Sequence, residues 1–216
     1  MREAIARILQ GVILALIRRS PGVEFMIAGL GNPGEEYRMS RHNAGFMTAE
    51  RLVREHGLGR PRRRYEGRYV EGKIAGRHTA VMMPQTYMNS SGDAVALAAR
   101  RKHIPPDRII VVHDDMDFPF GVVRAKHGGG HGGHNGLKSI VKELGSDAFS
   151  RVRIGIGRPE DPEEDPREWV LTPFDEPEDQ VSAVIGTALA CAEAIIAEGI
   201  EAAMGRFNRR EGGASE

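Results

Sequence analysis

Residues 108–112, Arg-Ile-Ile-Val-Val, constrain the fold more than any other segment of the chain. Four consecutive branched apolar side chains leave no polar face for solvent, so a strand with this sequence needs cover on both sides. Such strands lie in the middle of a sheet that carries helices on both faces. Residues 25–30, Phe-Met-Ile-Ala-Gly-Leu, are typical of a second short buried strand.

The other strands and helices follow from the spacing of apolar residues. Residues 68–74 alternate as a half-solvated strand does, and residues 78–83 are expected to be their hairpin partner. Further strands are predicted at 122–126 and 151–157, and a closing amphipathic helix is predicted to run unbroken over 178–204. Strands that alternate with helices predict an α/β fold: a single domain whose central mixed β-sheet is flanked by helices.

The length of 216 residues suits one domain with its own core. We expect residues 1–24 to be a leader that is dispensable or disordered, residues 25–208 to form the α/β domain, and residues 209–216 to be a flexible tail. The apolar run at 8–17 is shorter than the ~20 residues that span a bilayer, so no membrane partner is expected. The single Cys191 cannot form an internal disulfide, which favours a reducing, cytoplasmic location.

The formal net charge of +0 hides a local imbalance. Residues 51–77 contain nine Lys or Arg against three acids, whereas residues 160–179 contain ten acids against one Arg. Segregated charge can give one domain a basic face for a polyanion and an acidic edge. The alternative is that these charges interleave on the folded surface, and the sequence does not decide between the two.

Residues 128–136 contain six glycines, together with His131, His134 and Asn135. Glycine takes positive φ angles and lets a ligand approach the backbone closely. Apolar spacing over 137–144 predicts a helix that starts near His134, where free N–H groups favour a phosphate or another anion. A flexible linker is the alternative, but linkers seldom place His-Asn at a helix start, so a ligand site is favoured.

Residues 29–34, Gly-Leu-Gly-Asn-Pro-Gly, satisfy the G-x-G-x-x-G dinucleotide fingerprint taken literally. That motif needs its third glycine to open a helix, whereas helical spacing here begins only near Asn43, so a dehydrogenase is a minor alternative. His42 lies at this helix start, where the dipole disfavours the imidazolium and predicts a neutral, basic ring. A purely structural role as a helix cap is the alternative for His42.

Two kinds of hydrolytic chemistry fit the polar residues. His127, His131 and His134, with His113 and nearby aspartates, are ligand types that zinc or iron accepts, but their spacing matches no helical ligand pair. A metal-free site needs a histidine with an aspartate partner to activate water, and amides to donate to the oxyanion. The chain has no G-x-S-x-G motif, which favours water over a covalent serine nucleophile.

Several longer motifs occur in a fixed order: Gly29 to Gly34 with Tyr37, Ser40 to Asn43 and Gly45; Pro84 to Gly92; His113-Asp114 with Asp117; Gly128 to Lys138; and Arg151 to Gly157. Together they resemble the bacterial peptidyl-tRNA hydrolase family over about residues 26–207. The resemblance implies hydrolysis of the ester between a peptide and the 3′-terminal ribose of tRNA, which releases tRNA for reuse in translation. We also expect a cytoplasmic monomer without cofactor or metal ion.

The resemblance assigns roles at the matching positions. His42 matches the catalytic base, Asp114 the carboxylate that holds this base, and Asn32 the residue that separates N-blocked from free aminoacyl-tRNA. Contacts to substrate and tRNA fall on Tyr37, Tyr87, Asn89, Asn135, Lys126 and Arg153. Within this group the amides position substrate and water, the tyrosines contact substrate, and the two cations grip the 5′-phosphate of tRNA. Two alternatives remain: a tRNA- or phosphate-binding module without catalysis, and a His-rich metal-dependent hydrolase.

Overall fold

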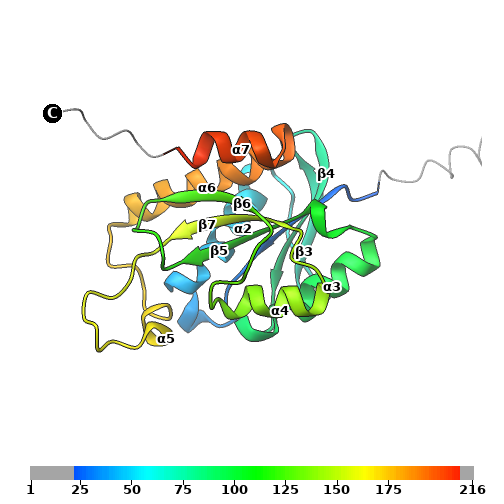
Figure 1. The fold of residues 1–216 in the computed structure, drawn as a ribbon. Coiled ribbons are helices and arrows are strands. Elements are labelled where there is room, and N and C mark those ends of the chain that lie inside the picture. The colour runs from blue at the N-terminus through cyan, green and yellow to red at the C-terminus, as the bar shows by residue number, and fades with distance from the viewer. Residues whose placement is uncertain (1–21, 210–216) are drawn as a thin grey trace, which may run out of the picture.

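A seven-stranded sheet forms the centre of the structure, a computed structural model that describes residues 22–209 (Figure 1). Its strands are β1 (Phe25–Gly29), β2 (Arg62–Arg64), β3 (Gly67–Ile74), β4 (Arg77–Pro84), β5 (Ile109–Asp115), β6 (Val123–His127) and β7 (Ser150–Gly155). Their order across the sheet is β2-β3-β4-β1-β5-β7-β6. The expected leader, apart from residues 22–24, and the tail beyond residue 209 lie outside the described residues.

The sheet is mixed, as the sequence predicts. β1 runs parallel to β4 and to β5, and β5 runs parallel to β7. β3 is antiparallel to β2 and β4, which confirms the predicted hairpin, and β6 is antiparallel to β7. The carboxyl ends of β1, β4, β5 and β7 therefore open at one edge of the sheet, the carboxyl edge. The β5 residues Ile109 to Val112 are at most 1% exposed, so the apolar run lies in the interior.

Helices cover both faces of the sheet because the strands present apolar side chains alternately to each face (Figure 1). One face packs against α2 (Ala44–Glu55), α6 (Glu178–Glu198) and α7 (Ile200–Phe207). The other packs against α3 (Ser91–Lys102) and α4 (Asn135–Leu144). Within β5, Val112 belongs to the first layer and Val111 to the second. The short helices are η1 (Glu35–Tyr37), η2 (Arg41–Asn43), η3 (Met88–Ser90), η4 (Pro106–Arg108) and α5 (Pro166–Trp169).

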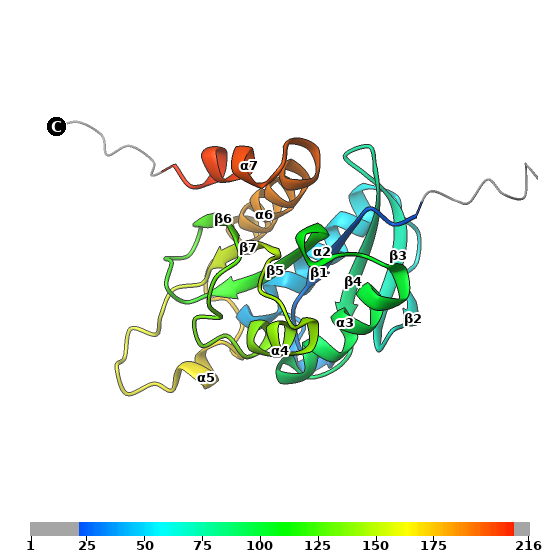
Figure 2. The same ribbon diagram turned by 45° about the vertical axis from the view of Figure 1, so that its right-hand side comes forward.

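The prediction of one unbroken helix over 178–204 is wrong. The chain changes direction at Gly199, whose φ of 90° and ψ of 165° end α6 and separate it from α7 (Figure 2). Glycine takes this conformation without a Cβ clash. The turn lets α7 lie against the edge strand β6, where the side chain of Asn208 makes two hydrogen bonds with the backbone of Ala125, at 2.9 and 2.8 Å.

α6 is the one helix within residues 22–209 that is long and apolar enough to cross a membrane by length and composition alone. More than half of its apolar window is buried inside the fold, with Val184, Ile185 and Leu189 in the core. Burial of this kind is typical of the core helix of a globular domain.

Gly45 sets how closely α2 approaches the sheet. A Cβ at this position would lie 2.3 Å from the carbonyl oxygen of Val112 and 2.4 Å from the amide nitrogen of Leu30. Only glycine therefore allows the first turn of α2 to rest directly on the carboxyl ends of β1 and β5. This close packing brings η2, the turn just before α2, next to the end of β5.

Candidate active site

A cleft of about 670 Å³ opens at the carboxyl edge. Eight of the nine side chains singled out in the sequence line it: Asn32, His42, Tyr87, Asn89, Asp114, Lys126, Asn135 and Arg153. Tyr37 is not among the lining residues. It lies in η1, where its main-chain oxygen accepts hydrogen bonds from the amide and hydroxyl of Ser40. The fold thus gathers residues that are far apart in the sequence: Asn32 and Arg153 are 121 positions apart.

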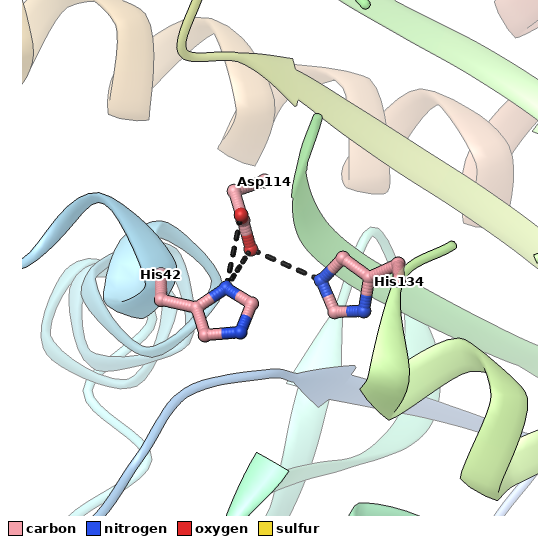
Figure 3. A group of neighbouring side chains, drawn as sticks. All are labelled: His42, Asp114 and His134. Atoms are coloured by element: carbon pink, nitrogen blue, oxygen red, sulfur yellow. Dashed lines mark hydrogen bonds and ion pairs between the residues drawn. The ribbon is translucent and has the colours of Figure 1, made fainter. Parts of the chain in front are cut away.

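His42 and Asp114 are in direct contact in this cleft (Figure 3). Nδ1 of His42 lies 2.9 Å from each carboxylate oxygen of Asp114. The imidazole comes from η2, and the carboxylate comes from the end of β5. Asp114 is 2% exposed and His42 is 9% exposed. Because Nδ1 faces the carboxylate, it carries the proton that is donated, and Nε2 keeps a free lone pair.

A second imidazole, that of His134, also contacts Asp114 and shares Oδ1 with His42. Nε2 of His134 lies 3.1 Å from Oδ1 of Asp114, so the carboxylate bridges the two rings (Figure 3). Nδ1 of His134 accepts the backbone N–H groups of Gly136 and Leu137, at 3.1 and 3.4 Å, and thereby caps α4. A nitrogen that accepts two N–H groups has no proton of its own, so Nε2 carries the ring proton and donates it to Asp114.

The site determines the pKa values of the buried pair. Burial raises the pKa of Asp114, but His42 and His134 outweigh burial through charge and hydrogen bonds, and hold this pKa well below its usual range. Burial lowers the pKa of His42, but the charge and hydrogen bond of Asp114 outweigh it, so the pKa lies above its ordinary value of 6.5. The direction is opposite to that expected from the helix dipole alone.

His113 is a buried structural histidine next to this pair. Its Nδ1 lies 2.6 Å from the main-chain oxygen of Asp114, and its ring packs edge-on against His134 with 4.9 Å between centroids. Burial and the neighbouring His134 hold the pKa of His113 well below its ordinary value. Within residues 22–209 its buried Nε2 has no hydrogen-bond partner. His113 therefore has a structural role at the end of β5, and its lowered pKa keeps the ring neutral.

The metal alternative loses two of its predicted histidine ligands. His127 and His131 are exposed, and of the three histidines in that pattern only His134 reaches the centre of the site. His42, Asp114 and His134 do bring their ligand atoms within 4.8 Å of one another. However, the cap on α4 takes the lone pair of Nδ1 of His134, so its Nε2 carries a proton and has no lone pair for a cation. The geometry favours a hydrogen-bonded chain over a metal centre.

The amide of Asn32 is oriented by the backbone around it. Its Oδ1 accepts the N–H of Met88 at 2.8 Å, and its main chain exchanges two hydrogen bonds with the side chain of Asn43, at 2.7 and 3.0 Å. Since Oδ1 is occupied, Nδ2 remains to donate into the cleft. Asn89 also lines the cleft, and Ser90, not Asn89, is the cap residue of α3.

Cations line the side of the cleft formed by β6 and β7. Nε of Arg153 lies 2.7 Å from Oδ2 of Asp115, whereas Lys126 makes no ion pair within residues 22–209. The buried Arg151 donates to the carbonyls of Gly129 and Gly130, at 2.7 Å to Gly130. A buried arginine therefore holds the glycine-rich segment, which supports a shaped site over a flexible linker.

Arg41, next to His42, is a positioning residue that the sequence did not single out. It is 1% exposed, and its guanidinium stacks 3.6 Å above the ring of Trp169. The same guanidinium donates to Thr172, to the carbonyl of Pro173 and to Asp175. These contacts fasten residues 169–175 to η2, and the amide of His42 donates to the carbonyl of Val170 at 2.8 Å. An arginine beside a polar helix start gave no signal of burial, because arginine is mostly exposed.

The known proteins that this chain resembles, in sequence and in structure, are peptidyl-tRNA hydrolases. A family model described as peptidyl-tRNA hydrolase matches residues 26–214. Curated relatives named peptidyl-tRNA hydrolase include those of Syntrophotalea carbinolica, 43% identical over 186 residues, and Geobacter sulfurreducens, 46% identical over 188 residues. Both alignments cover 86% of this chain, and 97% and 96% of those proteins. The chain also resembles the crystal structure of peptidyl-tRNA hydrolase from Acinetobacter baumannii, with a TM-score of 0.78 and 37% identity, over 86% of this chain and 94% of that one.

Proposed function

We propose a mechanism that starts from two points: the chain belongs to the peptidyl-tRNA hydrolase family, and it hydrolyses peptidyl-tRNA. In this mechanism His42 is the general base and water is the nucleophile. The observation that carries the proposal is the chain His42–Asp114–His134 inside the cleft. It leaves Nε2 of His42 as the basic nitrogen that can face a water molecule and a bound ester.

The first step forms a carbon–oxygen bond. Nε2 of His42 takes a proton from water while the water oxygen attacks the ester carbonyl carbon. Asp114 accepts the Nδ1 proton of His42 as a hydrogen bond and stabilises the imidazolium. The carbonyl oxygen becomes an oxyanion, which the amide Nδ2 of Asn32 stabilises. A single donor of this kind typically contributes ~3 kcal/mol to transition-state stabilisation.

The second step breaks the ester. The tetrahedral intermediate collapses, the bond from carbon to the ribose oxygen breaks, and the imidazolium of His42 returns its proton to that oxygen. The products are a tRNA with a free 3′-terminal ribose hydroxyl and a peptide carboxylic acid, which loses its proton to solvent and becomes a carboxylate. Asn89 and Asn135 position substrate and water, and Tyr87, which is 66% exposed and lines the cleft, contacts the substrate. Tyr37, which does not line the cleft, contacts the part of the substrate that extends beyond it.

Asn32 also serves as the residue that separates N-blocked from free aminoacyl-tRNA. The enzyme acts as a cytoplasmic monomer without cofactor or metal ion, and residues 1–24 and 209–216 are dispensable for its activity. The mechanism needs few groups, which supports the proposal that no cofactor takes part: one base, one carboxylate and amide donors are sufficient for ester hydrolysis.

One assay tests the function directly. N-acetyl-aminoacyl-tRNA should release tRNA in the presence of the enzyme, whereas the unblocked aminoacyl-tRNA should be cleaved far more slowly. The rate should not change when a zinc-selective chelator is added. Retention of the labelled substrate on the protein without release of tRNA would instead identify a binding module. Loss of activity with the chelator that zinc restores would identify a metal-dependent hydrolase.

Lys126 and Arg153 grip the 5′-phosphate of tRNA in this proposal. We expect Lys126→Gln to raise KM several-fold with little change in kcat, because a phosphate contact positions the tRNA and takes no part in the chemistry. The slope of log KM against log salt concentration should fall by about one, since about one counterion is released per phosphate contact. Lys142→Gln is the matched control, because Lys142 is exposed on α4 and does not line the cleft. Equal effects of both variants would contradict the assignment.

A further inference from the structure

A second, smaller hollow of about 440 Å³ lies at the β2 end of the sheet. It is lined by Arg63, Arg64, Tyr65, Glu66, Gln85 and Thr86. Its walls are the turn between β2 and β3 and the segment that follows β4, which are joined by a 2.8 Å hydrogen bond from the amide of Gln85 to the carbonyl of Glu66. Oγ1 of Thr86 is buried, and within residues 22–209 it has no hydrogen-bond partner.

The hollow opens at the same edge of the sheet as the active site. Arg64 pairs with Gly67, and Gly67 pairs with Pro84, the last residue of β4. β4 runs parallel to β1, and β1 runs parallel to β5, which ends with Asp114 and Asp115. β2 is four strand positions from β5, which corresponds to ~19 Å at ~4.8 Å per strand.

One continuous segment connects the two sites. Gln85 and Thr86 line the hollow, and the next residues, Tyr87 to Asn89, line the active-site cleft. A substrate that is extended from the cleft along this segment therefore reaches the hollow. At ~3.3 Å per extended residue, ~19 Å corresponds to about six residues of a peptide.

The chemistry of the path favours peptide over RNA. The large apolar side chains exposed within residues 22–209 are Met39, Tyr87 and Leu171, at 53%, 66% and 39%. Of these three, Tyr87 and Leu171 line the cleft, and Tyr87 lies on the segment that leads to the hollow. Exposed apolar side chains there offer apolar contacts, which a peptide provides and a phosphate backbone does not. In the proposed function, the phosphate contacts lie on the opposite flank, at Lys126 and Arg153.

The hollow itself is basic. Arg63 and Arg64 are exposed and form no ion pair within residues 22–209, while Glu66 is the one acid among the lining residues. Charges on an edge strand such as β2 discourage aggregation, which accounts for exposed arginines but not for a lined hollow between them and the cleft. We propose that this hollow is a subsite for the nascent peptide, and that Arg63 and Arg64 bind an acidic side chain about four to six residues from the ester.

The inference rests on the proposed function and is tested with defined substrates. The substrates would be N-acetylated hexapeptidyl-tRNAs with Glu or Lys at the fifth residue from the ester. The other side chains of the peptide would be neutral. We expect kcat/KM to be about two- to five-fold higher for Glu than for Lys, the range that exposed ion pairs supply. The preference should disappear in the double variant Arg63→Gln/Arg64→Gln. It should also be absent when Glu or Lys stands at the second residue, which is too close to the ester to reach the hollow.

Arg62→Gln is the matched control, because Arg62 lies on the same strand and is exposed but does not line the hollow. It should keep the preference for Glu. If the double variant instead lowers kcat/KM equally for every substrate, including N-acetyl-aminoacyl-tRNA, and flattens the salt dependence, the arginines bind RNA and the proposal is wrong. Equal rates for Glu and Lys in the unmodified enzyme would also overturn it. Cleavage of N-acetyl-aminoacyl-tRNA by the same preparation verifies the proposed function separately.

Discussion

His42→Ala is expected to lower kcat for peptidyl-tRNA hydrolysis by about two to four orders of magnitude, the range that a positioned general base contributes. The variant should stay folded, because the carboxylate of Asp114 keeps its second donor, the Nε2–H of His134. Release of tRNA from N-acetyl-aminoacyl-tRNA under single-turnover conditions measures the loss. Thermal unfolding measured on the same sample checks that the fold is retained.

His131→Ala is the control for this variant. His131 also lines the cleft, but it is exposed, and its Nδ1 is occupied by the amide of Gly133 at 3.1 Å. It makes no contact with Asp114 within the described part of the chain, so its removal should leave the His42–Asp114 pair intact and kcat nearly unchanged. A His42→Ala enzyme that keeps more than a tenth of the rate would exclude His42 as the base.

The sequence predicted the fold well where the signal is local. The apolar run at 109–112 and the alternation at 68–74 determine which strands are buried and which are half-exposed, because side chains alternate across a strand. The break at Gly199 was missed for a physical reason. Apolar spacing continues through Ile200 and Met204, and one glycine costs a helix only ~1 kcal/mol, so periodicity does not show the change of direction.

The active site could be predicted only in part from the sequence, because its key contacts join residues that are distant along the chain. The motifs identify His42 and Asp114, and the structure brings them into contact across 72 positions. The role of His134 depends on two facts that no local pattern contains: its Nδ1 caps α4, and its Nε2 reaches Asp114. From local pattern alone, the predicted roles of His134 are a helix start and a metal ligand.

Two opposing effects act on the pKa of His42: the dipole of the following helix lowers it, and the carboxylate of Asp114 raises it. A helix N-terminus disfavours a nearby imidazolium by ~0.3–1 kcal/mol. A carboxylate at about 4 Å stabilises it by roughly 4 kcal/mol at an effective dielectric constant of ~20, and Asp114 lies closer, at 2.9 Å. The carboxylate therefore outweighs the dipole, and the pKa of His42 is raised above 6.5. The base must be unprotonated to act, so the rate should increase with pH through this raised pKa.

Asp114→Asn should change both the rate and its pH dependence. In the carboxylate, Oδ1 accepts from both rings and Oδ2 also lies 2.9 Å from Nδ1 of His42, whereas an amide keeps only one of these two oxygens. The cap on α4 keeps the proton of His134 on Nε2, so His134 takes the amide oxygen and the amide NH₂ faces Nδ1 of His42. His42 then carries its proton on Nε2 and loses its basic nitrogen. We expect kcat to fall by up to about four orders of magnitude, as for a serine protease triad in which the tautomer is reversed.

The pH profile of the residual activity distinguishes this explanation from a general loss of structure. Without the negative charge, burial is the dominant influence left on His42, so its pKa should fall below 6.5 and the acidic limb of the kcat/KM profile should move to lower pH. In the double variant Asp114→Asn/His134→Ala, the amide oxygen is free to accept the Nδ1 proton of His42, and about ten-fold of the lost rate should return. An acidic limb that stays in place, or a double variant slower than the single one, would show that Asp114 does not set the tautomer of His42.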